Sequence, residues 1–325
     1  MATVALIQKM YSLNDESTSG ESYTIPDDAC TAITTNSVGG GGGGSCGNDG
    51  SVIWRGHGNT TTTSGFTIAT DAWAASGAIP ASRQYCGYSG FDTCMIQAYG
   101  SSNDDFYRFT FAVGTWATEA VDTGQDNQLC TSFGFARRLH TMGGLLAPNT
   151  DQRVFDLADD THVAGTSIGD NTRWAAGVSI ASRGYLIGGY DGSSISLDNA
   201  VVWLPENDAW VNGAAITGGG RRLAHAVTDL AKIYFRSGLT YPSPGAGNLN
   251  HRYDPDTNAW ATMSVMVNSM TAGVGTPSNG NMYSPIQVFS FSQIAYIDSE
   301  SSPEDTAKIK LTYTLGYDYT MPWGG

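Results

Sequence analysis

Five histidines are the residues of this sequence best suited to proton transfer or metal binding. They occur singly, at His57, His140, His162, His225 and His251. No CxxC motif or cysteine–histidine cluster accompanies them, so the sequence predicts no zinc site and no other metal site. We therefore expect each histidine to have a structural role.

The carboxylates and the glycine-rich segment offer little chemistry either. Asp104-Asp105 and Asp159-Asp160 are adjacent in sequence, and neighbours in a strand point to opposite faces, so neither pair suits acid–base catalysis. The glycine run 39–44 lacks the Gly-Lys-Ser/Thr ending of a phosphate-binding loop. The sequence thus predicts a protein that is not an enzyme and that binds no cofactor.

The five cysteines cannot all pair within one chain. Cys86 and Cys94 flank a seven-residue segment centred on Gly90 that predicts a hairpin. Counting outward from Gly90 places the two thiols opposite each other, where a disulfide could form. Cys30 and Cys46 could similarly close the loop that holds the glycine run. Five unpaired thiols fit the same spacing equally well, so the sequence leaves both disulfides open.

The composition excludes several classes of protein. Sixteen basic residues against 30 acidic residues give a formal net charge of −14, which is too acidic for nucleic-acid binding or for adhesion to anionic membranes. No apolar run approaches the roughly 18 residues of a membrane-spanning helix. The chain has 325 residues, is rich in glycine and lacks helical periodicity, which favours one large all-β domain.

The start of the chain and the rest of it point to different compartments. Residues 1–10 have no basic segment, and Gln8 and Lys9 interrupt their apolar stretch, so they do not resemble a secretory signal. The remainder is poor in lysine and rich in glycine, serine, threonine and asparagine, which is typical of extracellular proteins. We expect a virion or extracellular location reached without a signal peptide.

A repeat of about fifty residues organises the chain. Arg173 and Arg222 each precede a tyrosine by twelve positions and a glycine by sixteen. A tryptophan ends each of these two repeats, at Trp210 and Trp260. Weaker copies end at residues 73, 116 and 162, so the repeat ends fall at 73, 116, 162, 210 and 260. Periods of this length are typical of β-propellers and other repeat folds.

Two features of these repeats resemble kelch repeats. Gly188-Gly189 resembles the diglycine that follows the second kelch strand, and Tyr253 and Trp260 resemble the tyrosine–tryptophan pair of that family. The resemblance covers roughly residues 25–290, with His162 in place of one tryptophan. It implies four-stranded blades around an axis. The kelch fold also hosts galactose oxidase, but the histidine-bearing motif of that enzyme family is not recognisable here.

The physics of stacked blades accounts for the same residues. A four-stranded sheet cannot bury both faces alone, so neighbouring sheets stack around the axis, and the tryptophans fill the gaps between them. The innermost strands are crowded, which explains small residues there. These small residues are Gly87, Ser132, Gly177 and Ala226.

We predict a six-bladed kelch-type propeller over residues 1–297. The expected blades are 20–73, 80–116, 128–162, 172–210, 219–260, and 265–297 completed by residues 1–15. The N-terminal strand would close the last blade, since residues 10–18 resemble residues 252–259. We expect residues 298–325 to form an acidic linker and an aromatic tail. The tail could pack on its own propeller as an extra strand or, as we favour, add to a sheet edge of another subunit.

Binding remains the best functional hypothesis, because propellers carry function on loops that share one face. Tyr190 and Asp191 follow one diglycine position, and Tyr241 follows the next, so these residues are candidate contacts. Tyr317, Tyr319 and Trp323 are candidate contacts in the tail, for self-association or for binding other virion proteins. We expect a structural or adhesive virion component of a tailed bacteriophage that contacts proteins or host glycans. The alternatives are a free carbohydrate-binding lectin and a secreted sugar oxidase.

Overall fold

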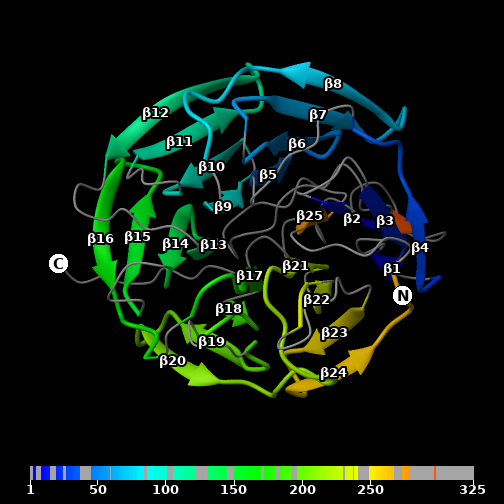
Figure 1. Cartoon of the computed structure of the whole chain (residues 1–325), viewed down its shortest axis with the longest axis vertical. Helices are drawn as coiled ribbons and strands as arrows, with labels where there is room; N and C mark the ends of the chain where they lie inside the picture. The colour runs from blue at the N-terminus through cyan, green and yellow to red at the C-terminus, as the bar shows by residue number, and fades with distance from the viewer. Residues whose placement is uncertain are drawn as a thin grey trace.

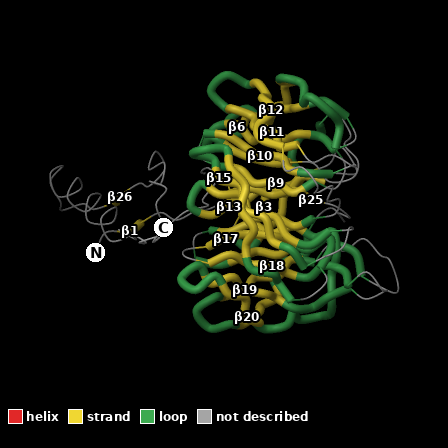
Figure 2. The backbone as a smooth tube through the Cα atoms, turned by 90° about the vertical axis from the view of Figure 1, so that its left-hand side faces the viewer, coloured by secondary structure: helices red, strands yellow, loops and turns green. Residues whose placement is uncertain are grey.

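The computed structural model is an all-β propeller (Figure 1). Seen from the side, the strands form a central layer with turns and loops on both faces (Figure 2). None of the described residues belongs to a helix long and apolar enough to cross a membrane. The structure describes residues 3–4, 9–14, 20–24, 27–36, 45–58, 60–83, 86–91, 93–100, 105–121, 130–144, 150–169, 172–180, 183–191, 196–229, 231–236, 238–240, 249–266, 273–277 and 296–297.

Five blades each consist of four consecutive antiparallel strands. The first contains β5 (Ser45–Asn48), β6 (Val52–Gly56), β7 (Thr63–Thr67) and β8 (Ala72–Ser76). The second contains β9 (Gly87–Gly90), β10 (Cys94–Ala98), β11 (Asp105–Thr110) and β12 (Thr115–Val121). The third contains β13 (Thr131–Phe135), β14 (Arg138–Met142), β15 (Gln152–Asp156) and β16 (Thr161–Gly165). The fourth contains β17 (Ala176–Ile180), β18 (Arg183–Ile187), β19 (Ala200–Leu204) and β20 (Ala209–Asn212). The fifth contains β21 (His225–Thr228), β22 (Ile233–Arg236), β23 (Asn250–Asp254) and β24 (Ala259–Thr262).

A further four-stranded sheet, here called the end sheet, draws its strands from both ends of the chain. Its order is β25 (Gly273–Pro277), β2 (Lys9–Asn14), β3 (Gly20–Thr24) and β4 (Ala29–Ala32). Strand β2 pairs with β25, so the N-terminal segment joins the last part of the propeller, as the sequence analysis expected. We expected six blades; the chain has five blades of consecutive strands plus this end sheet. A separate two-stranded ladder pairs β1 (Thr3–Val4) with β26 (Tyr296–Ile297).

The predicted boundary of the first blade is wrong. We placed residues 20–73 in one blade, but residues 20–32 form β3 and β4 of the end sheet. The physical reason is that short antiparallel hairpins pair strands that follow one another in sequence, so β2, β3 and β4 stay together. Residues 45–76 supply four strands by themselves.

The innermost strands contact one another in a closed cycle around the axis (Figure 1). The cycle runs β5, β9, β13, β17, β21, β25 and back to β5. The strands approach so closely that a Cβ atom at Gly177 would clash with the carbonyl oxygen of Ser132 in the preceding blade. This close approach explains the small residues that the sequence places on the innermost strands.

The aromatic wedges occupy equivalent places in the five blades, each as the second residue of the outermost strand. They are Trp73, Trp116, His162, Trp210 and Trp260. Trp260 packs into a core shared with the preceding blade, against Phe235 and Tyr253. Its indole N–H donates to the carbonyl oxygen of Ala214 in that blade at 2.9 Å. The expected equivalence of Trp210 and Trp260 is confirmed.

The outermost strands follow one another around the rim (Figure 1). Hydrogen bonds join the residues that follow one outermost strand to the residues that precede the next outermost strand. Asp71 accepts a hydrogen bond from the Thr34 hydroxyl at 2.7 Å, and Asn258 accepts one from the Ala214 backbone N–H at 2.7 Å. Asp28 of the end sheet accepts one from the Ser264 backbone N–H at 3.0 Å. These side chains all lie two residues before the wedge position, where every sheet has a positive φ. The residues are Asp28, Asp71, Gly114, Asp160, Asp208 and Asn258.

The Cys86–Cys94 disulfide that the sequence left open does not form, because the hairpin turns at a different place. Gly87 pairs with Ala98 and Gly90 pairs with Met95, so the turn lies beyond Gly90 rather than on it. Cys86 therefore lies near the end of β10 that is remote from Cys94, about 13 Å away at the rise of an extended strand. A disulfide requires Cα atoms within about 7 Å.

The orientation of Cys30 does not support the predicted Cys30–Cys46 disulfide either. The Cys30 sulfur accepts a hydrogen bond from the Arg236 guanidinium at 3.2 Å, in the blade on one side of the end sheet. Cys46 belongs to β5, which contacts the end sheet from the other side. Cys30 thus carries a free thiol that faces the blade of Arg236.

Candidate functional site

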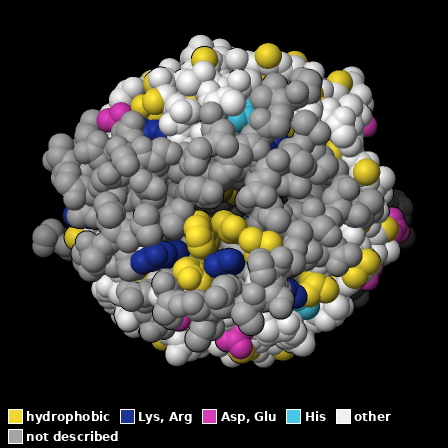
Figure 3. Space-filling view, viewed as in Figure 1, with side chains coloured by type: hydrophobic (Ala, Val, Ile, Leu, Met, Phe, Trp, Pro, Cys, Tyr) yellow, Lys and Arg dark blue, Asp and Glu magenta, His cyan; other side chains and the backbone are white. Residues whose placement is uncertain are grey.

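The best candidate site lies at the joint between blades β17–β20 and β21–β24. Ala176 pairs with Ile187 and His225 pairs with Arg236, so the residues before β17 and β21 and after β18 and β22 share one face of the propeller. We call this the upper face. Figure 3 views it and shows basic and hydrophobic side chains together near its centre.

Backbone hydrogen bonds hold this part of the upper face in a fixed frame. Arg173 and Tyr190 exchange two of them, at 3.0 and 2.8 Å, and Arg222 and Leu239 exchange two at the same distances. Bonds between the blades lock the two pairs together. They are Leu223 N–H to Trp174 O at 3.0 Å, Gly189 N–H to Arg221 O at 2.6 Å and Arg221 N–H to Leu197 O at 3.1 Å.

Two bulky residues in this frame have strained backbones. Trp174 has φ 55° and Leu223 has φ 57°, and they occupy equivalent positions just before β17 and β21. Such conformations cost roughly 1–3 kcal/mol and persist only where the surroundings enforce them. The diglycine Gly188-Gly189 has φ 66° and 108°, and a Cβ at Gly188 would clash with the Arg221 carbonyl oxygen. The close approach of the two blades therefore requires glycine there.

This frame stacks an arginine against two aromatic rings. The Arg222 guanidinium carbon lies 4.8 Å from the Tyr190 ring centroid and 5.5 Å from that of Trp174. The two rings are 5.7 Å apart at an angle of 37°. All three residues are half-buried, so each keeps part of its surface at the solvent. A guanidinium beside aromatic faces can bind anionic groups and planar or apolar ones at the same place.

The structure places two of the predicted contact residues at this cluster. Tyr190 is part of it, and half-buried Asp191 follows directly. Tyr241, Tyr317, Tyr319 and Trp323 lie outside the described residues. The sequence analysis missed the roles of Trp174 and Arg222. The repeat did mark Arg222 and Arg173 as equivalent, so that spacing was the available signal.

A buried serine–histidine contact elsewhere resembles a catalytic dyad in geometry only. His57 Nε2 lies 2.9 Å from Ser64 Oγ, which also accepts a hydrogen bond from Asn36 at 2.8 Å. Burial, together with the Arg55 charge, lowers the pKa of His57 to about 3. His57 is fully buried and Ser64 nearly so. An imidazole of such low basicity, out of contact with solvent, is a poor general base.

Two further histidines are held neutral in the core. His140 stacks on Phe133 at 4.9 Å and contacts Trp203 at 4.5 Å, and burial lowers its pKa to about 3. Burial also lowers the pKa of His225 to about 3, with the Arg236 charge acting in the same direction. Within the described part of the chain, no three His, Cys, Asp or Glu side chains group as metal ligands would.

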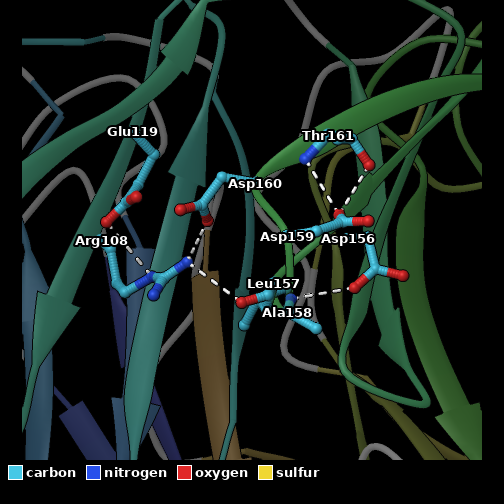
Figure 4. Close-up of polar contacts among 8 residues, drawn as sticks. All are labelled: Arg108, Glu119, Asp156, Leu157, Ala158, Asp159, Asp160 and Thr161. Atoms are coloured by element: carbon cyan, nitrogen blue, oxygen red, sulfur yellow. Dashed lines mark hydrogen bonds and ion pairs between the residues drawn. The ribbon is translucent and has the colours of Figure 1, made fainter.

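A polar cluster on the rim joins blades β9–β12 and β13–β16 (Figure 4). Arg108 forms ion pairs with Glu119 at 3.3 Å and with Asp160 at 2.6 Å. Burial raises the pKa of Glu119, and Asp160 acts in the same direction against the opposing Arg108 charge. Asp159 instead accepts hydrogen bonds from Thr161. The adjacent aspartates thus point to different partners, and Asp160 joins the blades two residues before the wedge position, which His162 occupies.

Comparison with protein-family models gives no match for this chain, and comparison with curated proteins gives no relative.

Proposed function

We propose that the chain is a non-enzymatic binding scaffold whose upper face contacts a partner through Trp174, Tyr190 and Arg222. The observation that carries this proposal is the stacking of Arg222 against two half-buried rings on a strained, hydrogen-bonded frame. Strained backbone concentrates at functional sites. Aromatic residues and arginine are also the residue types most enriched among the binding hot spots of interfaces.

The finer description of the scaffold is a kelch-type propeller of six blades with the end sheet as the sixth. The equivalent wedges and the diglycine before the upper-face loops support the kelch type. The β2–β25 pairing and the Asp28–Ser264 hydrogen bond support the end sheet as the element that locks the ring. Mixing strands from both chain ends conceals edges that would otherwise pair with other chains.

Binding to an array of glycans and candidate protein partners tests the proposed scaffold. Tyr190→Ala removes one ring from the site, and we expect it to weaken binding about tenfold, a loss of roughly 1.4 kcal/mol. Val163→Ala is the matched control, because Val163 is exposed on the rim strand β16, away from this joint. Equal binding by wild type and Tyr190→Ala would contradict the proposed site.

The amino-acid composition supports a proposal for the biological setting of the chain. We propose a virion component of a tailed bacteriophage, in contact with other virion proteins, with copies of itself or with a host glycan. The low lysine content and the net charge of −14 support an extracellular role without nucleic-acid or membrane binding. Mass spectrometry of purified particles tests this setting, and a particle that lacks the chain would contradict it.

A free lectin is the second candidate, favoured by the ring pair of Trp174 and Tyr190, because sugar rings pack on aromatic faces. Purified protein that binds glycans but is never found in particles would support the lectin. The sugar oxidase alternative is tested by copper content and by turnover on galactose. Stoichiometric copper together with turnover would replace the scaffold proposal.

A further inference from the structure

One arginine of the upper face is buried without a compensating charge. Arg221 is 7% exposed, and its buried Nε–H has no hydrogen-bond partner. None of the ion pairs among the described residues involves it. Its pKa is lowered, with burial as the cause. A buried cation without a partner disfavours folding. An anion supplied from outside the chain would compensate this charge.

A second unpartnered polar side chain lies at the same joint. His251 on β23 is 4% exposed, and neither of its buried ring nitrogens has a hydrogen-bond partner. It shares a strand face with Tyr253, which packs against blade β17–β20. Arg221 lies at the same joint, because its backbone exchanges hydrogen bonds with Gly189 and Leu197 of blade β17–β20. Burial lowers the pKa of His251, and the Arg221 charge acts in the same direction. An arginine N–H and a histidine ring without hydrogen-bond partners thus both lie at the joint between these two blades.

We propose that this joint binds a carboxylate-bearing sugar, with Arg221 holding the carboxylate. The inference rests on the proposed binding role of the upper face and names its ligand class. A guanidinium matches a carboxylate through two parallel hydrogen bonds. The neighbouring Trp174 and Tyr190 rings offer apolar surface to the sugar ring, and Arg222 adds a second positive charge.

The aromatic rings beside the arginines favour an acidic sugar over an acidic peptide. The net charge of −14 repels free anions in general, so an anion must find a local concentration of arginines such as Arg221 and Arg222. A uronic acid carries its carboxylate on a rigid ring that can also contact Trp174 and Tyr190. A flexible glutamate side chain presents the same carboxylate without that ring and loses more entropy on binding.

Calorimetric titration of the full chain with trigalacturonate tests the proposal. We expect binding by wild type, a shift of the His251 ring signals in NMR spectra, and at least tenfold weaker binding of the methyl-esterified, neutral trimer. Arg221→Gln should lose at least tenfold in affinity. Its melting temperature should equal or exceed that of wild type, because the variant removes an uncompensated buried charge. A purely structural arginine would instead lower the melting temperature.

Matched variants and probes complete the experiment. Arg252→Gln should bind as wild type does, because Arg252 adjoins His251 on β23 but points to the opposite face of the blade. If Arg221→Gln does not fold, Arg221→Lys replaces it, and we expect weaker binding because lysine lacks the planar fork. Wild-type affinity in the folded Arg221 variant or for the ester would overturn the inference, as would equal or tighter binding of triglutamate. The protein could bind an array partner in a way that Tyr190→Ala weakens and yet not bind trigalacturonate. That result would refute the acidic-sugar ligand but not the proposed binding scaffold.

Discussion

Acidification from pH 7 to pH 5 should destabilise the propeller through three buried histidines, His57, His140 and His225. Burial lowers the pKa of each to about 3 in the folded state, from an ordinary value of 6.5. Between pH 6.5 and pH 3 these histidines are therefore protonated in the unfolded chain but remain neutral in the folded chain. The stabilisation is complete above about pH 6.5 and is lost as the pH falls toward 3.

The magnitude follows from the size of these shifts. At pH 5 each histidine of the unfolded chain lies 1.5 pH units below its ordinary pKa, so each costs about 2 kcal/mol at roughly 1.4 kcal/mol per unit. Three histidines together cost about 6 kcal/mol, which is comparable with the whole stability of a typical domain, about 5–15 kcal/mol. Glu119 acts in the opposite direction, because burial raises its pKa and protonation on acidification therefore favours the folded state.

Urea denaturation of wild type and His140→Gln at pH 7 and pH 5 isolates one histidine from these opposing groups. The variant loses packing against Phe133 at both pH values, but its stability should fall by about 2 kcal/mol less than that of wild type between them. In NMR spectra of the folded wild type, the His140 ring signals should not titrate between pH 7 and pH 5. Equal pH dependence of the two proteins, or a folded-state His140 titration near pH 6.5, would refute the reasoning.

Four further predictions concern the ring and its thiols. Deletion of residues 1–14 removes β2 from between β25 and β3, so we expect a marked fall in the melting temperature, and an unchanged melt would show that the ring does not need this strand. Trp260→Ala should lower the free energy of unfolding measured in urea by about 3 kcal/mol, because it leaves a cavity in a core shared by two blades. A loss below about 1 kcal/mol would contradict the packing role of this tryptophan. Gly177→Ala should lower the free energy of unfolding by about 1–3 kcal/mol, because its Cβ would clash with the Ser132 carbonyl oxygen. An unchanged free energy of unfolding would show that the inner strands are less closely packed than described. Burial raises the pKa of Cys130 to about 12, so iodoacetamide should modify this thiol only after unfolding, and rapid modification of the native protein would contradict its burial.

The propeller could be predicted from the sequence because wedges and small inner-strand residues must recur at fixed places in every blade. Trp210 and Trp260 lie in equivalent positions because each fills the same gap beside the preceding blade. The boundary of the first blade could not be predicted in this way. Cys30 occupies the wedge position of the end sheet, so no aromatic residue marks where that sheet ends. Similarly, Gly90 suggested a turn, but the glycine lies within β9 and the hairpin turns later.

The upper-face site shows a different limit of sequence reasoning. Arg221 and His251 are thirty residues apart, and neither has a special spacing in the repeat. They come together because the start of β21 is bound to the diglycine of the preceding blade while β23 turns His251 toward the same blade. A repeat pattern predicts positions that every blade shares, since those positions serve packing. A binding site depends on what one joint has and the other joints lack. Among the described residues, this joint has an arginine without an ion pair and a histidine without a hydrogen-bond partner, so the proposed binding function is best tested between these two blades.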